Sequence, residues 1–185
     1  DAVIDGDLIL SEGIKDGDVT LENVTVKGRT LIRGGGANSI HVTGNSVLGA
    51  VVMERDGAPV RIAIENDAKV GNITVGEKAA EAVVTGDVPS VTVAGSAKLT
   101  AQDAKIDTIS VTASDASVAL TGQSVIKNVE VADNAKNADV SVAKDATINT
   151  IQIQADGAKV SGEGKVSDVK ANANNIAVNT NGTNV

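Results

Sequence analysis

Residues 104–111, with the sequence AKIDTISV, carry the pattern that decides the fold of this chain. A small residue is followed by apolar residues at the third, sixth and eighth positions. The same pattern recurs at residues 124–131, SVIKNVEV, and at residues 146–153, ATINTIQI. Alternating apolar and polar residues predict short, half-buried strands. A strand pattern that returns about every twenty residues predicts a coil that stacks on its own copies.

Copies of this pattern can be aligned along the chain by their first apolar position. In this alignment the position is held by Leu21, Leu48, Val70, Val88, Ile106, Ile126, Ile148 and Val166. The residue before the second apolar position is small and polar in most copies, as at Asn72 and Asn128. Such residues tolerate the left-handed conformation that a tight corner demands. Small residues such as Ser124 open the pattern, as expected where a chain bends into a crowded interior.

We therefore predict an all-β fold, a parallel β-helix (β-solenoid) with three sides and about 8–9 coils of roughly 20 residues. A further alternating stretch, such as Val118 and Leu120, lies between the copies and supplies the third inward face. We expect one domain over residues 1–185, with the repeated coils at 19–171. Residues 1–18 should form an irregular N-terminal coil or cap, and residues 172–185 a fading last coil.

Composition fits a narrow interior and argues against several classes of function. The chain of 185 residues is 42% hydrophobic but has no Phe, Tyr or Trp, so Val, Ile, Leu and Ala must fill the core. A net charge of −8 argues against a nucleic-acid partner, because phosphate binding needs a basic surface. Without an apolar run of about 18 residues, no membrane insertion is expected. The absence of cysteine excludes disulfides and thiol chemistry.

Three early stretches carry a resemblance to a known family: residues 18–26, DVTLENVTV, residues 33–42, RGGGANSIHV, and residues 59–62, PVRI. They resemble β-helix repeat modules of Gram-positive bacterial cell-surface proteins, many of which also carry S-layer-homology modules. The whole coil is also similar in architecture to the pectate-lyase-like right-handed parallel β-helix. These resemblances imply right-handed winding and an extracellular or cell-surface location.

The early coils are the expected place for any binding site. All four arginines, the only histidine and the only methionine lie before residue 62. The candidate ligand or partner surface consists of Arg33, His41, Glu54, Arg55 and Arg61. His41 should point outward, and its expected neighbour on the next coil, Ala63, offers no catalytic partner. We assign no catalytic residues, no cofactor-binding residues and no metal ligands.

Two further motifs have ordinary explanations. The glycines at 34–36 lack the Lys-Ser/Thr and the helix of a phosphate-binding loop, so they predict a loop with positive φ. The Asp-Gly-Asp turns at 5–7 and 16–18 offer carboxylates that suit calcium, but they lack the spacing of known calcium loops. Calcium is the one cofactor for which the sequence offers candidate ligands.

We expect a structural spacer or display module rather than an enzyme. A polysaccharide lyase or hydrolase needs paired carboxylates, or a base with a metal, on one face. The outward residues of most coils are Thr, Ser, Ala and Lys. The alternative is a glycan-binding or adhesin module that uses the early arginine-containing coils, and a pectate-lyase-like polysaccharide enzyme is less favoured. No capping helix is evident at either end, so the expected partners are neighbouring modules of a longer chain or other surface proteins.

Overall fold

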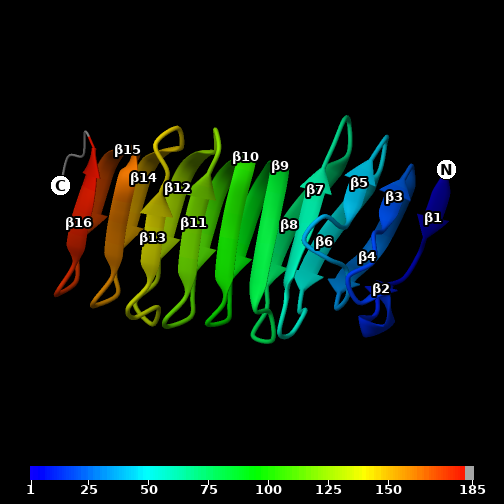
Figure 1. The fold of residues 1–185 in the computed structure, drawn as a ribbon, viewed down its shortest axis with the longest axis horizontal. Helices are drawn as coiled ribbons and strands as arrows, with labels where there is room; N and C mark the ends of the chain where they lie inside the picture. Colours follow the sequence, from blue (N-terminus) through cyan, green and yellow to red (C-terminus); the bar gives the residue numbers. More distant parts are fainter. Residues whose placement is uncertain (182–185) are drawn as a thin grey trace.

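The computed structural model describes residues 1–181 and is built almost entirely of parallel strands. About nine turns of about 20 residues stack on one another, which confirms the predicted all-β solenoid. Figure 1 shows the coils side by side along one long axis, with β1 at one end and β16 at the other. The expected last coil is described up to Asn181. The last four residues of that prediction, 182–185, lie outside the described residues.

The strands form two ladders of parallel pairs. The first ladder contains β3 (Thr20–Glu22), β5 (His41–Thr43), β7 (Pro59–Ile64), β11 (Ser117–Thr121), β13 (Asp139–Val142) and β16 (Ala177–Asn181). The second contains β1 (Ala2–Ile4), β2 (Leu8–Leu10), β4 (Val24–Ile32), β6 (Val47–Met53), β8 (Lys69–Val75), β12 (Val125–Val131) and β14 (Thr147–Ile153). Three long strands belong to both: β9 (Glu81–Val93), β10 (Lys98–Val111) and β15 (Lys159–Ala171). A short 3-10 helix, η1 (Glu12–Ile14), follows β2.

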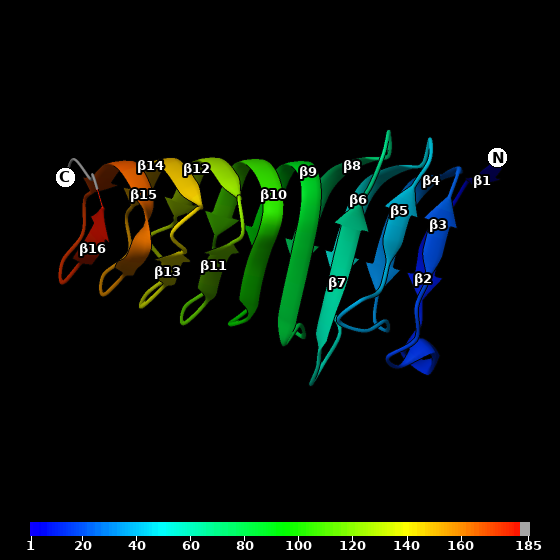
Figure 2. The same ribbon diagram turned by 45° about the horizontal axis from the view of Figure 1, so that its top comes forward.

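The second ladder bends, and this bend gives each coil three sides. In β8, Val70 and Ile73 are buried, while Gly71 and Asn72 between them are exposed. In a flat strand, side chains point alternately inward and outward, so two adjacent exposed residues mark a bend at which the inward side of the strand changes. Figure 2 shows the strands of this ladder curving over the upper edge of the stack. The first ladder supplies the third inward face.

The core is a set of aliphatic columns that run along the stack. The column of first apolar positions is buried throughout and consists of Val26, Leu48, Val70, Val88, Ile106, Ile126, Ile148 and Val166. Consecutive members face one another across paired strands, for example Ile106 and Ile126. Each coil adds ~4.8 Å to the stack. The interior offers only narrow slots, which explains why aliphatic side chains can fill it without aromatics.

The first copy of the pattern lies elsewhere than the sequence alignment predicted. Val26, rather than Leu21, pairs with Leu48, whereas Leu21 pairs with Val42 in the other ladder. An irregularity in β4 adds one residue after Val26, so that Thr30 takes the second inward position. Thr30 has 0% exposure. A polar residue in a core position hid the true copy.

The N-terminal residues add a coil of the same kind. β1 stacks on β4 with Ile4 opposite Val26, and β2 stacks on β4 with Leu10 opposite Ile32. The loop that contains η1 then leads into β3. Residues 2–10 therefore extend both the aliphatic columns and the ladder.

The left-handed residues lie at the turns between the ladders, not at the bend. Asn23 and Asp103 have φ of 54° and 48°. Asn72 and Asn128 have no positive φ, because they lie inside the continuous strands β8 and β12. The predicted left-handed corner is therefore wrong: a strand bends there, and the tight turn comes elsewhere.

Candidate functional site

The five residues of the predicted surface separate into two places. Arg33, Glu54 and Arg55 line one cavity beside η1. His41 and Arg61 lie on the first ladder, on β5 and β7. The structure therefore groups three of the five predicted residues and leaves the other two in a separate cluster.

The first place is a cavity of about 670 Å³ that we call the charged cavity. Every residue that lines it is charged except one glycine: Glu12, Lys15, Asp16, Arg33, Gly34, Glu54, Arg55, Asp56 and Lys78. These residues come from the η1 loop, the loop after β4, the loop after β6 and the loop before β9. Ionic and polar groups are thus concentrated where four irregular segments meet.

Two arginines in the charged cavity are held by carboxylates. Arg55 is only 9% exposed, and its Nη2 donates to Asp16 Oδ1 at 2.5 Å. Its Nη1 donates to the carbonyl oxygen of Pro59 at 3.3 Å. Arg33 Nε donates to Glu54 Oε2 at 3.4 Å. A buried guanidinium needs such partners, because an unpaired buried charge is costly.

The glycines at 34–36 hold the η1 loop against the stack. A side chain on Gly34 would overlap the carbonyl oxygen of Ser11, and one on Gly36 would lie 2.7 Å from the carbonyl oxygen of Asp16. Gly35 has a φ of 105°, which confirms the predicted positive φ at that position. Its N–H donates to the carbonyl oxygen of Lys15 at 2.8 Å. Close approach of two backbones thus explains this glycine run.

The backbone of Lys15 is strained. Its φ of 53° and ψ of −122° fall in a region that glycine favours. The surrounding structure must hold such a residue in place, and strain of this kind clusters at ligand sites. Lys15 is exposed and lines the charged cavity.

The second place is a cluster around His41, on the outer face of β5. His41 Nδ1 lies 2.9 Å from Glu65 Oε1, and Nε2 lies 2.9 Å from the carbonyl oxygen of Asn38. Both neighbours accept hydrogen bonds, so the ring donates from both nitrogens only when it is doubly protonated. Arg61 Nη2 also donates to the Asn38 carbonyl oxygen, at 3.2 Å. Ala63 is the register partner of His41, as expected, but the prediction that the next coil offers no partner is wrong, because Glu65 reaches back.

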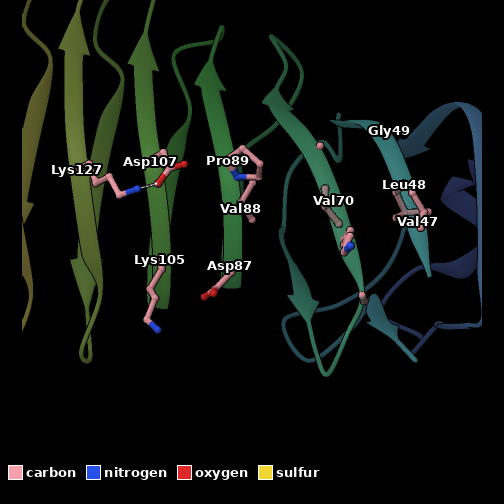
Figure 3. Close-up of a pocket in the computed structure, with 13 residues that line it drawn as sticks. Val47, Leu48, Gly49, Val70, Asp87, Val88, Pro89, Lys105, Asp107 and Lys127 are labelled. Carbon is pink, nitrogen blue, oxygen red and sulfur yellow. Dashed lines mark ion pairs between the residues drawn. The ribbon is translucent and has the colours of Figure 1, made fainter. Parts of the chain in front are cut away.

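The third place is a groove that was not predicted from the sequence. This groove of about 640 Å³ crosses the outer face of the second ladder. Figure 3 shows its lining side chains, with Val47 toward one end and the Lys127–Asp107 ion pair toward the other. Gly49 and Gly71 lie along it and leave it open. Gly71 has a packing role, because a side chain there would overlap the carbonyl oxygen of Gly49. Two glycines on exposed strand positions are the sequence signal that could have revealed this groove.

Three of the four aspartates in the Asp-Gly-Asp turns form ion pairs. Asp5 Oδ1 lies 2.7 Å from Lys27 Nζ, and Asp7 Oδ2 lies 2.8 Å from Arg29 Nη2. The side-chain hydrogen bond from Arg29 holds the pKa of the Asp7 carboxyl below its ordinary value. Asp16 faces Arg55, as described above. Within residues 1–181, no three His, Cys, Asp or Glu side chains come together in a way that could hold a metal ion.

Comparison with known proteins finds no matching family model, no matching curated protein and no matching solved structure. The parallel β-solenoid architecture of the expected resemblance is present, while its narrower assignment to one family finds no such support. In the part of the chain that the structure describes, no helix has the length and apolar character to cross a membrane.

Proposed function

We propose that this chain is a structural spacer or display module of a secreted or cell-surface bacterial protein, and that it is not an enzyme. The observation that carries this proposal is the uninterrupted stack from β1 to β16. Each coil packs mainly on the coils beside it, so length grows with coil number while the cross-section stays the same. A rod of this kind suits the task of holding neighbouring modules apart.

The same stack explains how the rod resists bending. Backbone hydrogen bonds run between coils, for example from the N–H of Thr147 to the carbonyl oxygen of Ser124 at 2.9 Å. Aliphatic columns run beside them along the whole length. Bending would have to stretch hydrogen bonds and open the packed columns on one side together. The partners of such a rod are neighbouring modules or other surface proteins, rather than nucleic acid or the membrane interior.

Deletion of one complete coil tests the spacer function. Removal of residues 124–145 joins Gln123 to Ala146, so that Ala146 takes the place of the small residue Ser124. We expect the shortened chain to fold and to lose ~4.8 Å of length. The biological activity of the protein that carries this chain should change with the number of coils. The same activity should tolerate replacement of outward residues such as Gln152 and Lys170. Loss of activity on such surface replacements would contradict a spacer role.

A second candidate function is a glycan-binding or adhesin module, and the charged cavity supports it. Arg33, Glu54 and Arg55 meet there with further charged side chains. A glycan array with hits that vanish in Arg33→Ala would support binding. A pectate-lyase-like activity is less favoured, because Glu54 and Asp16 are already paired with arginines. Turnover of polygalacturonate with added calcium would reverse that order.

A further inference from the structure

We propose that the charged cavity binds a saccharide that carries both a carboxylate and a free amine. This inference rests on the second candidate function, glycan binding, and is independent of the spacer role. It names the chemistry of the ligand, which the arginine-rich sequence alone does not indicate.

The first argument is the balance of charges around the cavity. Arg33 pairs with Glu54 and Arg55 pairs with Asp16. The side chains of four charged lining residues have no ion pair or hydrogen bond within residues 1–181: Lys15, Lys78, Glu12 and Asp56. Two are cationic and two are anionic. A ligand with one positive and one negative group can pair with the anionic and the cationic side chains alike. A ligand with a single charge would place that charge near lining side chains of the same sign.

The second argument is that part of the cavity is built before any ligand arrives. Arg55 is nine-tenths buried and fixed by Asp16 and Pro59. Lys15 is held in a strained backbone conformation by the hydrogen bond from Gly35 N–H to its carbonyl oxygen. A pre-formed site loses less entropy when it binds. The packing of the η1 loop against Gly34 and Gly36 keeps Lys15 in this strained conformation, because a free loop would relax.

The third argument concerns the class of ligand. Among residues 1–181, no apolar side chain lines the charged cavity. A peptide or an acyl chain would present apolar groups to this charged wall, at a desolvation cost. Sugar hydroxyls donate to carboxylates and accept from ammonium and guanidinium groups, so a saccharide offers hydrogen-bond partners to the anionic and the cationic lining residues alike. A volume of about 670 Å³ lies within the usual range for small-ligand sites.

Titration of the isotope-labelled full chain, followed by amide chemical shifts in NMR, tests the inference. The probe is muramic acid, a sugar with one carboxylate and one free amine. N-acetylmuramic acid retains only the carboxylate, glucosamine only the amine, and glucose neither. We expect muramic acid to shift amides of residues 11–16, 33–36 and 54–57, with at least about tenfold weaker binding of the three other sugars.

Three variants separate the cavity from the general charge of the protein. Lys15→Gly removes one cation and relieves the backbone strain, and Asp56→Asn removes one anion. Each should weaken muramic acid binding at least about tenfold without loss of thermal stability. Lys144→Ala, which removes an exposed lysine far along the stack, should leave the affinity unchanged.

The outcomes distinguish this inference from the function on which it rests. Equal binding of N-acetylmuramic acid and muramic acid would overturn the requirement for both charges while glycan binding stands. Wild-type affinity in Lys15→Gly and Asp56→Asn would overturn the location. Absence of shifts with all four sugars, together with a glycan array without hits, would overturn both.

Discussion

The carboxylate of Asp103 occupies the space that a side chain on Gly122 would need. Asp103 Oδ1 accepts a hydrogen bond from the backbone N–H of Gln123 at 2.9 Å, and a Cβ added to Gly122 would overlap this oxygen. Asn23 and Gly44 repeat the arrangement near the other end, where the added Cβ would lie 2.5 Å from Asn23 Oδ1. An Asp or Asn on one coil thus fixes the turn of the next coil, and glycine leaves the room for it.

Gly122→Ala should therefore destabilise the chain by about 1–3 kcal/mol, because it adds strain at a φ of 61° and displaces the Asp103 carboxylate. Urea unfolding followed by circular dichroism measures the loss. In an Asp103→Gly background the carboxylate is already absent, so the cost of Gly122→Ala should fall to the backbone strain alone. Fully additive losses in the double variant would contradict the proposed contact.

Ile126→Asp should unfold the chain, or nearly so. Ile126 is 0% exposed in the middle of an aliphatic column, and an aspartate there would bury an unpaired carboxylate. The expected loss exceeds about 4 kcal/mol. Val125 is the matched control, because it is the preceding residue, faces outward and is 41% exposed. Similar melting temperatures for Ile126→Asp and Val125→Asp would show that the assignment of inward and outward residues is wrong.

Ser124→Ala should cost about 1–3 kcal/mol, because it leaves buried backbone groups without their partner. Ser124 Oγ lies 3.0 Å from the carbonyl oxygen of Ala101 and 2.8 Å from that of Thr121, and it accepts from Ala104 N–H at 3.1 Å. Ser141→Ala, on an outward position of β13, should change stability by less than about 0.5 kcal/mol. Equal effects of the two changes in chemical denaturation would remove the role assigned to the buried hydroxyl.

The Asp7–Arg29 pair predicts a small acid sensitivity. Because Arg29 lowers the pKa of Asp7 below 3.8, its ionised form stabilises the fold. This contribution is fully present above pH 3.8 and disappears as the pH falls through the lowered pKa. Asp7→Asn and Arg29→Gln should both flatten the stability curve in this acidic range. An unchanged pH dependence in both variants would contradict the pairing.

The regular coils could be predicted from the sequence because their apolar spacing never changes. From Val88 to Ile153, each copy keeps its three inward positions and its small opening residue, whereas Ala171 at the third position of the last copy is exposed. The position of the first copy was predicted wrongly for a physical reason. Thr30 fills a core position of the true copy, while Leu21, Val24 and Val26 have the apolar spacing of a copy although they lie on two strands separated by a turn. Apolar periodicity cannot detect a polar residue that is buried.

The candidate site was predictable only in part. Clustering of arginines pointed to Arg33 and Arg55, which do line one cavity. The pairing of Arg55 with Asp16 was not predictable, because Asp16 lies in a loop without periodicity. Glu65 was missed as a partner of His41 because strand register places Ala63 there, and a longer side chain two residues further on makes the contact.

The central claim is that the coils form one stiff stack, and an electron-spin distance measurement tests it most directly. The chain has no cysteine, so in the double variant Val52→Cys/Lys170→Cys spin labels attach only at the two introduced cysteines. These positions are joined by six parallel steps along one outward row: Val52, Thr74, Thr92, Ser110, Glu130, Gln152 and Lys170. At ~4.8 Å a step, the two Cα atoms should lie about 29 Å apart. A single narrow distance distribution that agrees with this separation is the predicted result. A broad or multimodal distribution would contradict a stiff, continuous stack.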